Sequence, residues 1–405
     1  MPTKSKFRPE KGLLFKVVYR DKEFKEKMAR TVIKNRVKPY PGELFTSWLA
    51  RNATINYLQT PTFVNCYFPE YKNRLLNRDT DVFVDREIAG NFAKRMLLDE
   101  KEVFDTSLQS YSGYLNESVE PKTRNHLLTP IKVRGGYPRI KGLRYCPECL
   151  KEQECFRKEW RLSFYAVCPK HRNFLMDECP GCGEPVFLIK RKLDIEFFNC
   201  WNCGFVFKKA ECRKLDRRSM ADLYLENVME IMKNGYFRKD GGCYYSISYF
   251  IALKQVAKLI YSRGFRKSST LERECGVNGV EIRPVSEARG GVMEETMTVR
   301  EAAAVFTAAF EVLETPAAME RFVRENRVRV SDLRRDLSYL PYWYEKAIEK
   351  FSGKIYSPSH EEIENAAKWM MSRGMEVSYS SLSRITGTVL DVRKRPKLKK
   401  LVRKT

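Results

Sequence analysis

The sequence predicts a mostly α-helical protein, interrupted near its middle by a small module of short β-segments and irregular chain. Apolar residues recur at helical spacing along most of the 405 residues. Residues 143–213 are instead rich in Cys, Pro, Gly and aromatic residues. We expect a basic extension (1–38), an N-terminal helical domain of helix-turn-helix type (39–135), the irregular module (143–213), a helical segment (217–265), a linker (266–297) and C-terminal helical domains with a basic tail (298–405).

The N-terminal part carries two helix signals. In the extension, Phe24, Met28 and Val32 are spaced as on one face of a short basic amphipathic helix. In the segment PGELFTSWLARNATINYL, apolar residues share one helical face behind Pro41, whose missing N–H is harmless near a helix start. Further short helical patterns continue to about residue 130, which predicts a compact helical domain.

The irregular module contains four pairs of potential metal ligands, each with a two-residue gap. They are Cys146 and Cys149, Cys168 and His171, Cys179 and Cys182, and Cys200 and Cys203. Tetrahedral zinc takes four such ligands, and sites filled by four protein ligands are structural because no position is open for water or substrate. The sequence therefore predicts two structural zinc ions, with Gly181, Gly183 and Gly204 allowing tight turns of positive φ beside the ligands.

The four ligand pairs can be combined into two zinc sites in two ways. Sequential pairing closes each site locally, whereas an interleaved arrangement of the cross-brace kind would exchange the second and third pairs. We expect sequential pairing, because both intervals between paired ligands are short. Five cysteines stay outside both sites: Cys66, Cys155, Cys212, Cys243 and Cys275.

The C-terminal half has clear helix boundaries. Ser219 and Asp222 are a candidate capping pair for a helix that ends at Asn234-Gly235, and Thr298 with Glu301 forms a capping-box pattern. Residues 266–297 lack periodicity and are expected to be a linker or an irregular hairpin. Helix, turn and helix then follow one another twice, which fits either two helix-turn-helix units or a plain helical bundle.

The charge predicts a polyanionic partner. The chain has 75 Lys and Arg against 51 Asp and Glu, a net charge of +24, which favours DNA. If the C-terminal helices are helix-turn-helix units, the base-reading candidates are Arg334, Arg335, Ser380, Ser381 and Arg384. In the tail, candidates for phosphate contacts are Arg393, Lys394, Arg395, Lys397, Lys399 and Lys400, although such a block is also typical of a solvated, disordered tail.

The sequence lacks the motifs of several functional classes. The sequence has no phosphate-binding GxxxxGK[ST] loop and no HExxH, and its three histidines form no recognisable hydrolase dyad. We therefore expect no enzymatic activity, and a nuclease is a minor alternative. No apolar run is long enough to span a membrane and the N-terminus has no signal-peptide pattern, so we expect a cytoplasmic protein without a membrane partner.

Four segments together resemble the TniQ/TnsD family of transposon target-selection proteins. They are PYPGELFTSWLAR, LRYCPECLKEQECFRKEWRLSFYAVCPKH, FLMDECPGCGEPV and NCWNCGF, and they cover about residues 39–213. The family motif of Pro-Gly-Glu followed by Trp-Leu matches Pro41, Gly42, Glu43, Trp48 and Leu49. The resemblance also implies that Trp160 packs in the core against the first zinc hairpin.

The resemblance implies a non-catalytic adaptor in DNA transposition. Its expected partners are target DNA, the AAA+ ATPase regulator of the transposon, a CRISPR effector complex of Cascade type and a second copy of the chain. One branch of the family reads an attachment site directly, whereas another docks on the RNA-guided complex. A zinc-containing DNA- or RNA-binding regulator unrelated to transposition is the alternative function.

Overall fold

The structure is a computed structural model that describes residues 32–190, 198–212, 214, 220–263, 293–326, 328–335, 337, 339–351 and 358–387. The predicted basic helix before residue 32, the Ser219 cap, Cys275, most of the linker and the six tail cations lie outside these residues. The chain divides into two compact units, residues 1–347 and 348–405. Each is described by itself.

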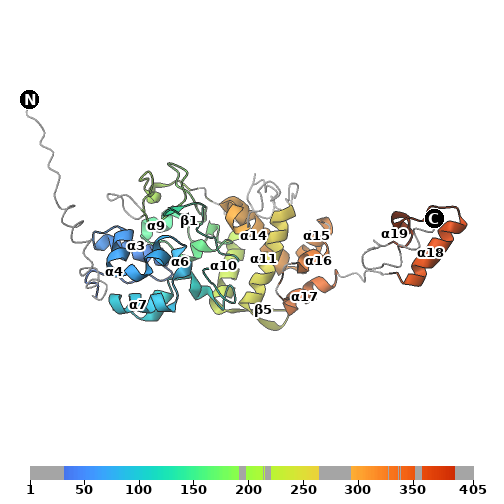
Figure 1. Ribbon diagram of the computed structural model, residues 1–405, viewed down its shortest axis with the longest axis horizontal. Coiled ribbons are helices and arrows are strands. Elements are labelled where there is room, and N and C mark those ends of the chain that lie inside the picture. Colours follow the sequence, from blue (N-terminus) through green and yellow to red (C-terminus); the bar gives the residue numbers. More distant parts are fainter. Residues whose placement is uncertain are drawn as a thin grey trace, which may run out of the picture. The chain divides into compact units, whose positions relative to one another are not determined.

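The N-terminal part of the first unit is a cluster of short helices (Figure 1). Their bounds are α3 Phe45–Ile55, α4 Thr60–Tyr67, η1 Pro69–Tyr71, α5 Lys72–Leu76, α6 Thr80–Phe83, α7 Arg86–Met96, α8 Glu100–Phe104 and η2 Leu108–Tyr111. The helix α3 begins four residues after Pro41, so this proline lies in the turn before the helix and not at its start. Gly42 occupies that turn with φ +74°.

Aromatic rings hold this helical domain together. Phe45 of α3 packs edge-on against Phe92 of α7 with ring centroids 5.1 Å apart, and Phe92 stacks on Phe68 at 3.6 Å. Trp48 is fully buried, and its indole N–H donates to the carbonyl of Val37 at 2.8 Å. The apolar face predicted for α3 is therefore the core face of the domain.

A small antiparallel hairpin of β1 Val133–Arg134 and β2 Tyr137–Pro138 precedes the irregular module. The elements of the module are α9 Pro147–Glu152, η3 Lys158–Arg161, β3 Val167–Cys168, β4 Asn173–Phe174 and η4 Phe207–Lys209. Strand β1 pairs with β2, and β3 pairs with β4. The expectation of a mostly helical fold with a small β and irregular module is confirmed.

The rest of the first unit is a helical layer with one hairpin that the sequence analysis did not predict. The elements are α10 Met220–Asn234, β5 Tyr236–Lys239, β6 Gly242–Tyr245, α11 Ser246–Arg263, α13 Met293–Thr296, α14 Val299–Glu314, α15 Pro316–Glu325, α16 Val330–Arg334 and α17 Tyr342–Glu349. The boundary between the two units falls within α17, after Ala347. Gly235 ends α10 with φ +76°, as predicted. Of the expected linker 266–297, the structure describes residues 293–297, and Met293–Thr296 forms α13.

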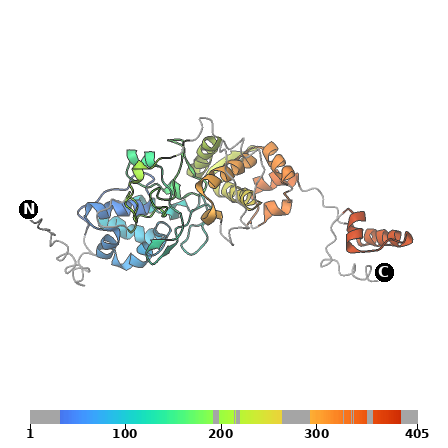
Figure 2. The ribbon, with the colours of Figure 1, turned by 90° about the horizontal axis from the view of Figure 1, so that it is seen from above.

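Helices α10, α11 and α14 pack together and meet the irregular module (Figures 1 and 2). Phe164 of the module stacks on Phe250 of α11 at 5.7 Å and lies edge-on to Phe306 of α14 at 6.1 Å. The capping box of Thr298 and Glu301 at the start of α14 is confirmed. One apolar core therefore joins the irregular module to the C-terminal helices of this unit.

The second unit contains α18 His360–Ser372 and α19 Tyr379–Ile385. A small core of five buried residues holds them together: Ile363, Ala367, Met370, Val377 and Leu382. Ser359 caps α18 and Ser378 caps α19, each through a capping box. This unit is a pair of helices separated by a short turn.

None of the helices within the described ranges is both long and apolar enough to cross a membrane alone. The bent pair α14 and α15, at 117° to each other, meets the length and composition limits jointly. Most of α14 is buried within the first unit.

Candidate metal centres and nucleic-acid interface

The first ligand cluster combines a helix start with a β-hairpin. Cys146 is the N-cap of α9, with Pro147 as the first helical residue, and its sulfur accepts the backbone N–H of Cys149 at 3.5 Å. Cys168 ends β3, and the turn that leads to β4 carries His171. A hydrogen bond from the N–H of Arg172 to the carbonyl of Cys168 closes this turn at 2.7 Å.

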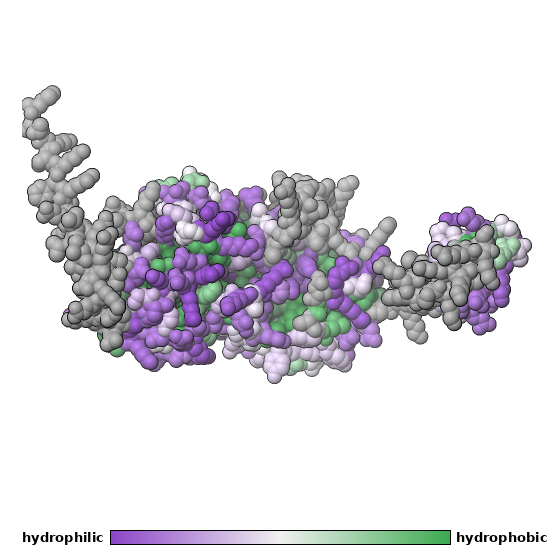
Figure 3. All heavy atoms as spheres, viewed as in Figure 1, coloured by the Kyte–Doolittle hydropathy of each residue, from purple (hydrophilic) through white to green (hydrophobic). Residues whose placement is uncertain are grey.

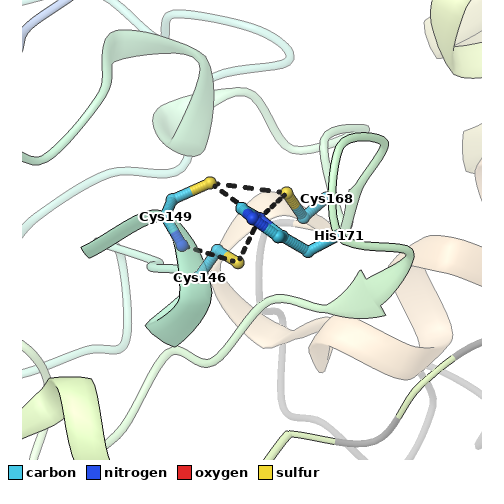
Figure 4. Close-up of side chains that lie close together, drawn as sticks. All are labelled: Cys146, Cys149, Cys168 and His171. Atoms are coloured by element: carbon cyan, nitrogen blue, oxygen red, sulfur yellow. Dashed lines mark hydrogen bonds between the residues drawn. The ribbon is translucent and has the colours of Figure 1, made fainter. Parts of the chain in front are cut away.

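The four side chains converge on one point (Figure 4). The Nδ1 atom of His171 lies 3.5 Å, 3.2 Å and 3.5 Å from the sulfurs of Cys146, Cys149 and Cys168. The sulfurs of Cys149 and Cys168 are 3.6 Å apart. Ligands about 2.3 Å from a tetrahedral zinc would lie about 3.7 Å from one another, so the cluster has nearly the size that such a centre requires.

Two polar side chains outside the ligand set contact the ligands. The Nε2 atom of His171 lies 3.1 Å from a carboxylate oxygen of Glu152, which also accepts a hydrogen bond from Lys170 at 2.5 Å. The buried amide of Asn173 lies between Cys146 and Cys212, with its Oδ1 3.4 Å from the sulfur of Cys146 and its Nδ2 2.8 Å from that of Cys212. Because Glu152 contacts Nε2, Nδ1 is the ring nitrogen of His171 that faces the thiols.

The second cluster consists of two similar turns. The N–H of Gly183 donates to the carbonyl of Cys179 at 2.8 Å, and the N–H of Gly204 donates to that of Cys200 at 2.9 Å. Both glycines have positive φ, as predicted. Gly181 does not; a Cβ there would lie 3.3 Å from the ring of Phe205 and 3.4 Å from the sulfur of Cys203, so little space is left for a side chain. The ligand atoms of Cys179, Cys182, Cys200 and Cys203 all lie within 4.8 Å of one another.

The two clusters use their ligands sequentially, so the interleaved alternative is wrong. In the first cluster, hydrogen bonds to the neighbouring cysteines lower the pKa of the Cys146 thiol to about 2 and raise that of Cys149. In the second, burial raises the pKa of Cys179. Several thiolates this close repel one another, so the full set ionises only when a cation neutralises it. Both donor sets, one of three thiols with an imidazole and one of four thiols, fit a structural zinc ion.

Aromatic side chains join the two clusters. Tyr145, which precedes the first ligand, packs against Phe207 at 4.7 Å, beyond the last ligand. Phe156 lies edge-on to Phe207 at 6.4 Å and to Trp160 at 5.8 Å. Trp160 is fully buried, which confirms its expected core position. The two clusters are thus parts of one packed module.

The Pro-Gly-Glu motif has a structural role. Glu43 is fully buried, and its carboxylate accepts hydrogen bonds from the N–H of Tyr40, the hydroxyl of Ser47 and the guanidinium of Arg51 at 2.9 Å, 2.8 Å and 2.6 Å. Burial raises the pKa of Glu43 although Arg51 opposes that shift. The hydroxyl of Ser47 in turn accepts the N–H of Phe156 at 2.9 Å. The motif therefore fastens α3 to the loop between the first two ligand pairs.

A buried ion network that the sequence analysis missed makes a second connection. The guanidinium of Arg161 is fully buried, 2.6 Å from the carboxylate of Asp79 and 3.0 Å from that of Asp81. It also donates to the carbonyl of Thr129 at 2.7 Å. The sequence holds no local pattern for this network, because the aspartates lie about eighty positions before the arginine.

The described residues predicted to read bases lie at helix ends. Arg334 is the last residue of α16, and Arg335 follows as its C-cap, paired with Asp332 at 3.0 Å. Ser380 and Ser381 lie in the first turn of α19, where Ser381 also takes part in the capping box, and Arg384 lies in the last turn. Only five residues form α16. The assignment of these five residues to DNA contacts stays a prediction.

These features define a class: a mostly helical protein built around a paired, closed metal-binding module of thiol and imidazole ligands. Residues 35–175 match the TniQ family, so the chain carries a TniQ domain, as the motifs indicated. The match includes the first ligand cluster and ends before the second. A search of curated proteins found no match.

Proposed function

We propose that the chain selects target sites in DNA transposition, as a non-catalytic adaptor between the target and the AAA+ ATPase regulator of a transposon. The target side of the adaptor is duplex DNA or an RNA-guided effector complex of Cascade type. The observation that carries the proposal is the TniQ domain at residues 35–175. Zinc is the proposed occupant of both centres.

The structure of the domain supports a scaffold role. The Glu43 contacts and the buried Arg161 network fasten the N-terminal helices to the metal-binding module. Both ligand sets contain four protein groups, which would leave a bound zinc no open position for a substrate. Such a module presents its surface in a fixed geometry, which suits the recruitment of other macromolecules.

The test has two steps. The genes beside this one should encode a transposase and an AAA+ ATPase. With those proteins purified, transposition of a donor element into a target plasmid should be directed to one region in the presence of the chain. Without the chain, insertions at that region should fall to background. The variant Cys149→Ala should behave like the omission, because the first centre loses a ligand.

The same assay separates the proposal from a regulator unrelated to transposition. Such a regulator would leave the number and the distribution of insertions unchanged when it is omitted. It would also fail to retain the ATPase in affinity capture with purified proteins. Either result at wild-type metal content would contradict the proposal.

A further inference from the structure

The hairpin β1–β2 carries charges in an ordered pattern. Arg134 pairs with Tyr137 and Val133 with Pro138 in antiparallel register. The N–H of Arg139 donates to the carbonyl of Lys132 at 2.8 Å and extends the ladder by one pair. Gly135 and Gly136, with φ of +63° and +77°, form the two-residue turn, and a Cβ at either would meet no atom within 4 Å. The tip of the hairpin is therefore open.

The two faces of this hairpin differ sharply. Val133 and Pro138 face inward, and Val133 packs against the core of the N-terminal helices. Ahead of the first strand, the N–H of Ile131 donates to Asp79 at 3.0 Å. Alternation along each strand places the remaining residues together on the outer face, and all of them are exposed: Lys132, Arg134, Tyr137 and Arg139. We call these four residues the outer face of the hairpin.

Most of the positive charge on the outer face is not neutralised. Lys132 pairs with Glu295 at 2.5 Å. Arg134 and Arg139 make no ion pair or side-chain hydrogen bond with any residue that the structure describes. A further cation lies beside them, because the ammonium of Lys190 is 3.4 Å from the ring centroid of Tyr137. Figure 3 shows hydrophilic and hydrophobic residues side by side on the face of the first unit that this view presents.

We propose that the outer face of the β1–β2 hairpin binds the phosphate backbone of duplex DNA, with Arg134 and Arg139 as the phosphate contacts. The proposal deepens the proposed function, on which it rests, and places a DNA contact in the TniQ domain. Arginine presents a planar fork of donors that matches a phosphate. A two-stranded ribbon is also narrow enough to enter the major groove.

The composition of the outer face favours DNA over a protein partner. The centres of protein interfaces are depleted in charged residues, whereas three of the four outer-face residues are cations. Tyr137 is covered on one side by Lys190 and lies 5.3 Å from Trp201. The ring of Tyr137 thus holds the ammonium of Lys190 beside the outer face. The anchored inner face keeps this arrangement rigid, so little conformational freedom is lost on binding.

The test measures the affinity of the full-length, metal-loaded chain for a fluorescent random-sequence duplex across a salt series. The slope of log affinity against log salt reports the number of phosphates neutralised, at about 0.9 per contact. The double variant Arg134→Ala and Arg139→Ala should make this slope less steep by about 2. The double variant Arg134→Lys and Arg139→Lys should keep most of the slope, since the charges remain.

The matched control is Arg238→Ala on the other hairpin, β5–β6. Arg238 is also an exposed strand arginine that makes no ion pair with a described residue. Its removal should leave affinity and slope unchanged. Metal content and the thermal midpoint of unfolding should equal those of wild type in all variants, because none of these side chains is buried.

Several results would overturn the proposal. One is a wild-type slope in the Arg134→Ala and Arg139→Ala variant; another is an equal loss in Arg238→Ala. Absence of duplex binding by the wild type would also reject it, as would a double variant that keeps duplex affinity but loses capture of the ATPase. None of these results would contradict the proposed function, which the insertion assay tests separately. An RNA-guided complex could direct insertion without a contact between this hairpin and DNA.

Discussion

Glu152 shows how one exposed carboxylate can organise a metal centre. It lies at the end of α9, the helix that carries the first ligand pair, yet it contacts His171 of the second pair. An acceptor at Nε2 keeps the proton on that nitrogen and leaves the lone pair of Nδ1 directed at the three sulfurs. Glu152 thereby links the helix that carries the first ligand pair to the turn that carries His171. It is a positioning residue for a ligand.

Replacing Glu152 by Gln should loosen the first centre. Loss of the carboxylate weakens the hydrogen bond to His171, and changes of this kind lower metal affinity by about 10- to 100-fold. Titration with a zinc-binding dye measures the affinity directly. Glu148→Gln is the control, because Glu148 lies on the same helix and, among the described residues, forms its ion pair with Lys151, at 2.6 Å, and not with a ligand. If the two variants lose zinc equally, Glu152 has no specific role in holding His171.

The ligand set itself predicts metal content. Purified under reducing conditions, the chain should contain about two zinc ions per molecule, because two complete four-ligand sets are present. Cys149→Ala should retain about one zinc and unfold at a lower temperature, because metal binding contributes to folding free energy. Elemental analysis and thermal unfolding check both statements. Iron or a coloured cluster in place of zinc would show that the proposed metal is wrong.

At the scale of elements, the sequence predicts the features that are encoded by residues close together in the chain. The two-residue gaps between ligands identified both clusters, because each chelating pair is set by one turn. The long periodic helices α11 and α14 were predicted for the same reason. Hairpins β1–β2 and β5–β6 were missed, although Gly135-Gly136 and Asp240-Gly241 are typical turn pairs, because strands of two to four residues show little alternation.

Helix α13 illustrates a contact that no sequence pattern announces. Its residue Glu294 is buried and accepts the N–H of Leu127 at 3.3 Å, and Arg124 lies 3.3 Å away. Burial opposes ionisation, but His126, at 3.9 Å, and these two groups outweigh burial and lower the pKa of Glu294 to about 2. A carboxylate at position 294 thus fastens α13 to the loop before the metal-binding module.

This contact predicts an acid-dependent loss of stability. A depressed folded-state pKa stabilises the fold above the unfolded pKa of 4.5, and the contribution disappears as the pH falls toward 2. Wild type should therefore exceed Glu294→Gln in free energy of unfolding near neutral pH, and the gap should narrow below about pH 4.5. Urea unfolding of both proteins at several pH values measures the gap. A gap independent of pH would assign the loss to packing and not to the charge.

At the scale of the whole molecule, the predicted DNA contacts fall into both compact units. The outer face of the β1–β2 hairpin lies in the first unit, residues 1–347, together with both ligand clusters. The serines Ser380 and Ser381 and the guanidinium of Arg384 belong to the second unit, residues 348–405. Phosphate contacts strengthen binding to every sequence, whereas contacts to base edges discriminate among sequences. The two units can therefore be tested for separate contributions.

The last prediction tests this separation with a chain that ends at Phe351, after α17, and so lacks α18 and α19. The truncated chain should keep two metal ions per molecule, because unit 1 contains both ligand sets. If α19 alone reads bases, selection from a random duplex library should yield a preferred sequence with the full chain and none with the truncated chain, which keeps Arg334 and Arg335. Arg384→Ala should weaken the same preference, by about 1 to 3 kcal/mol for one arginine to guanine contact.

The hairpin variant should give the opposite result. In the full chain, Arg134→Ala with Arg139→Ala should weaken binding to all duplexes and leave the preferred sequence unchanged, since phosphate contacts carry no sequence information. Affinities of each protein for the selected and a scrambled duplex provide the comparison. If the full chain selects no sequence at all, direct reading by α19 is rejected. Target choice would then have to come from a partner such as an RNA-guided complex, with the hairpin supplying affinity alone.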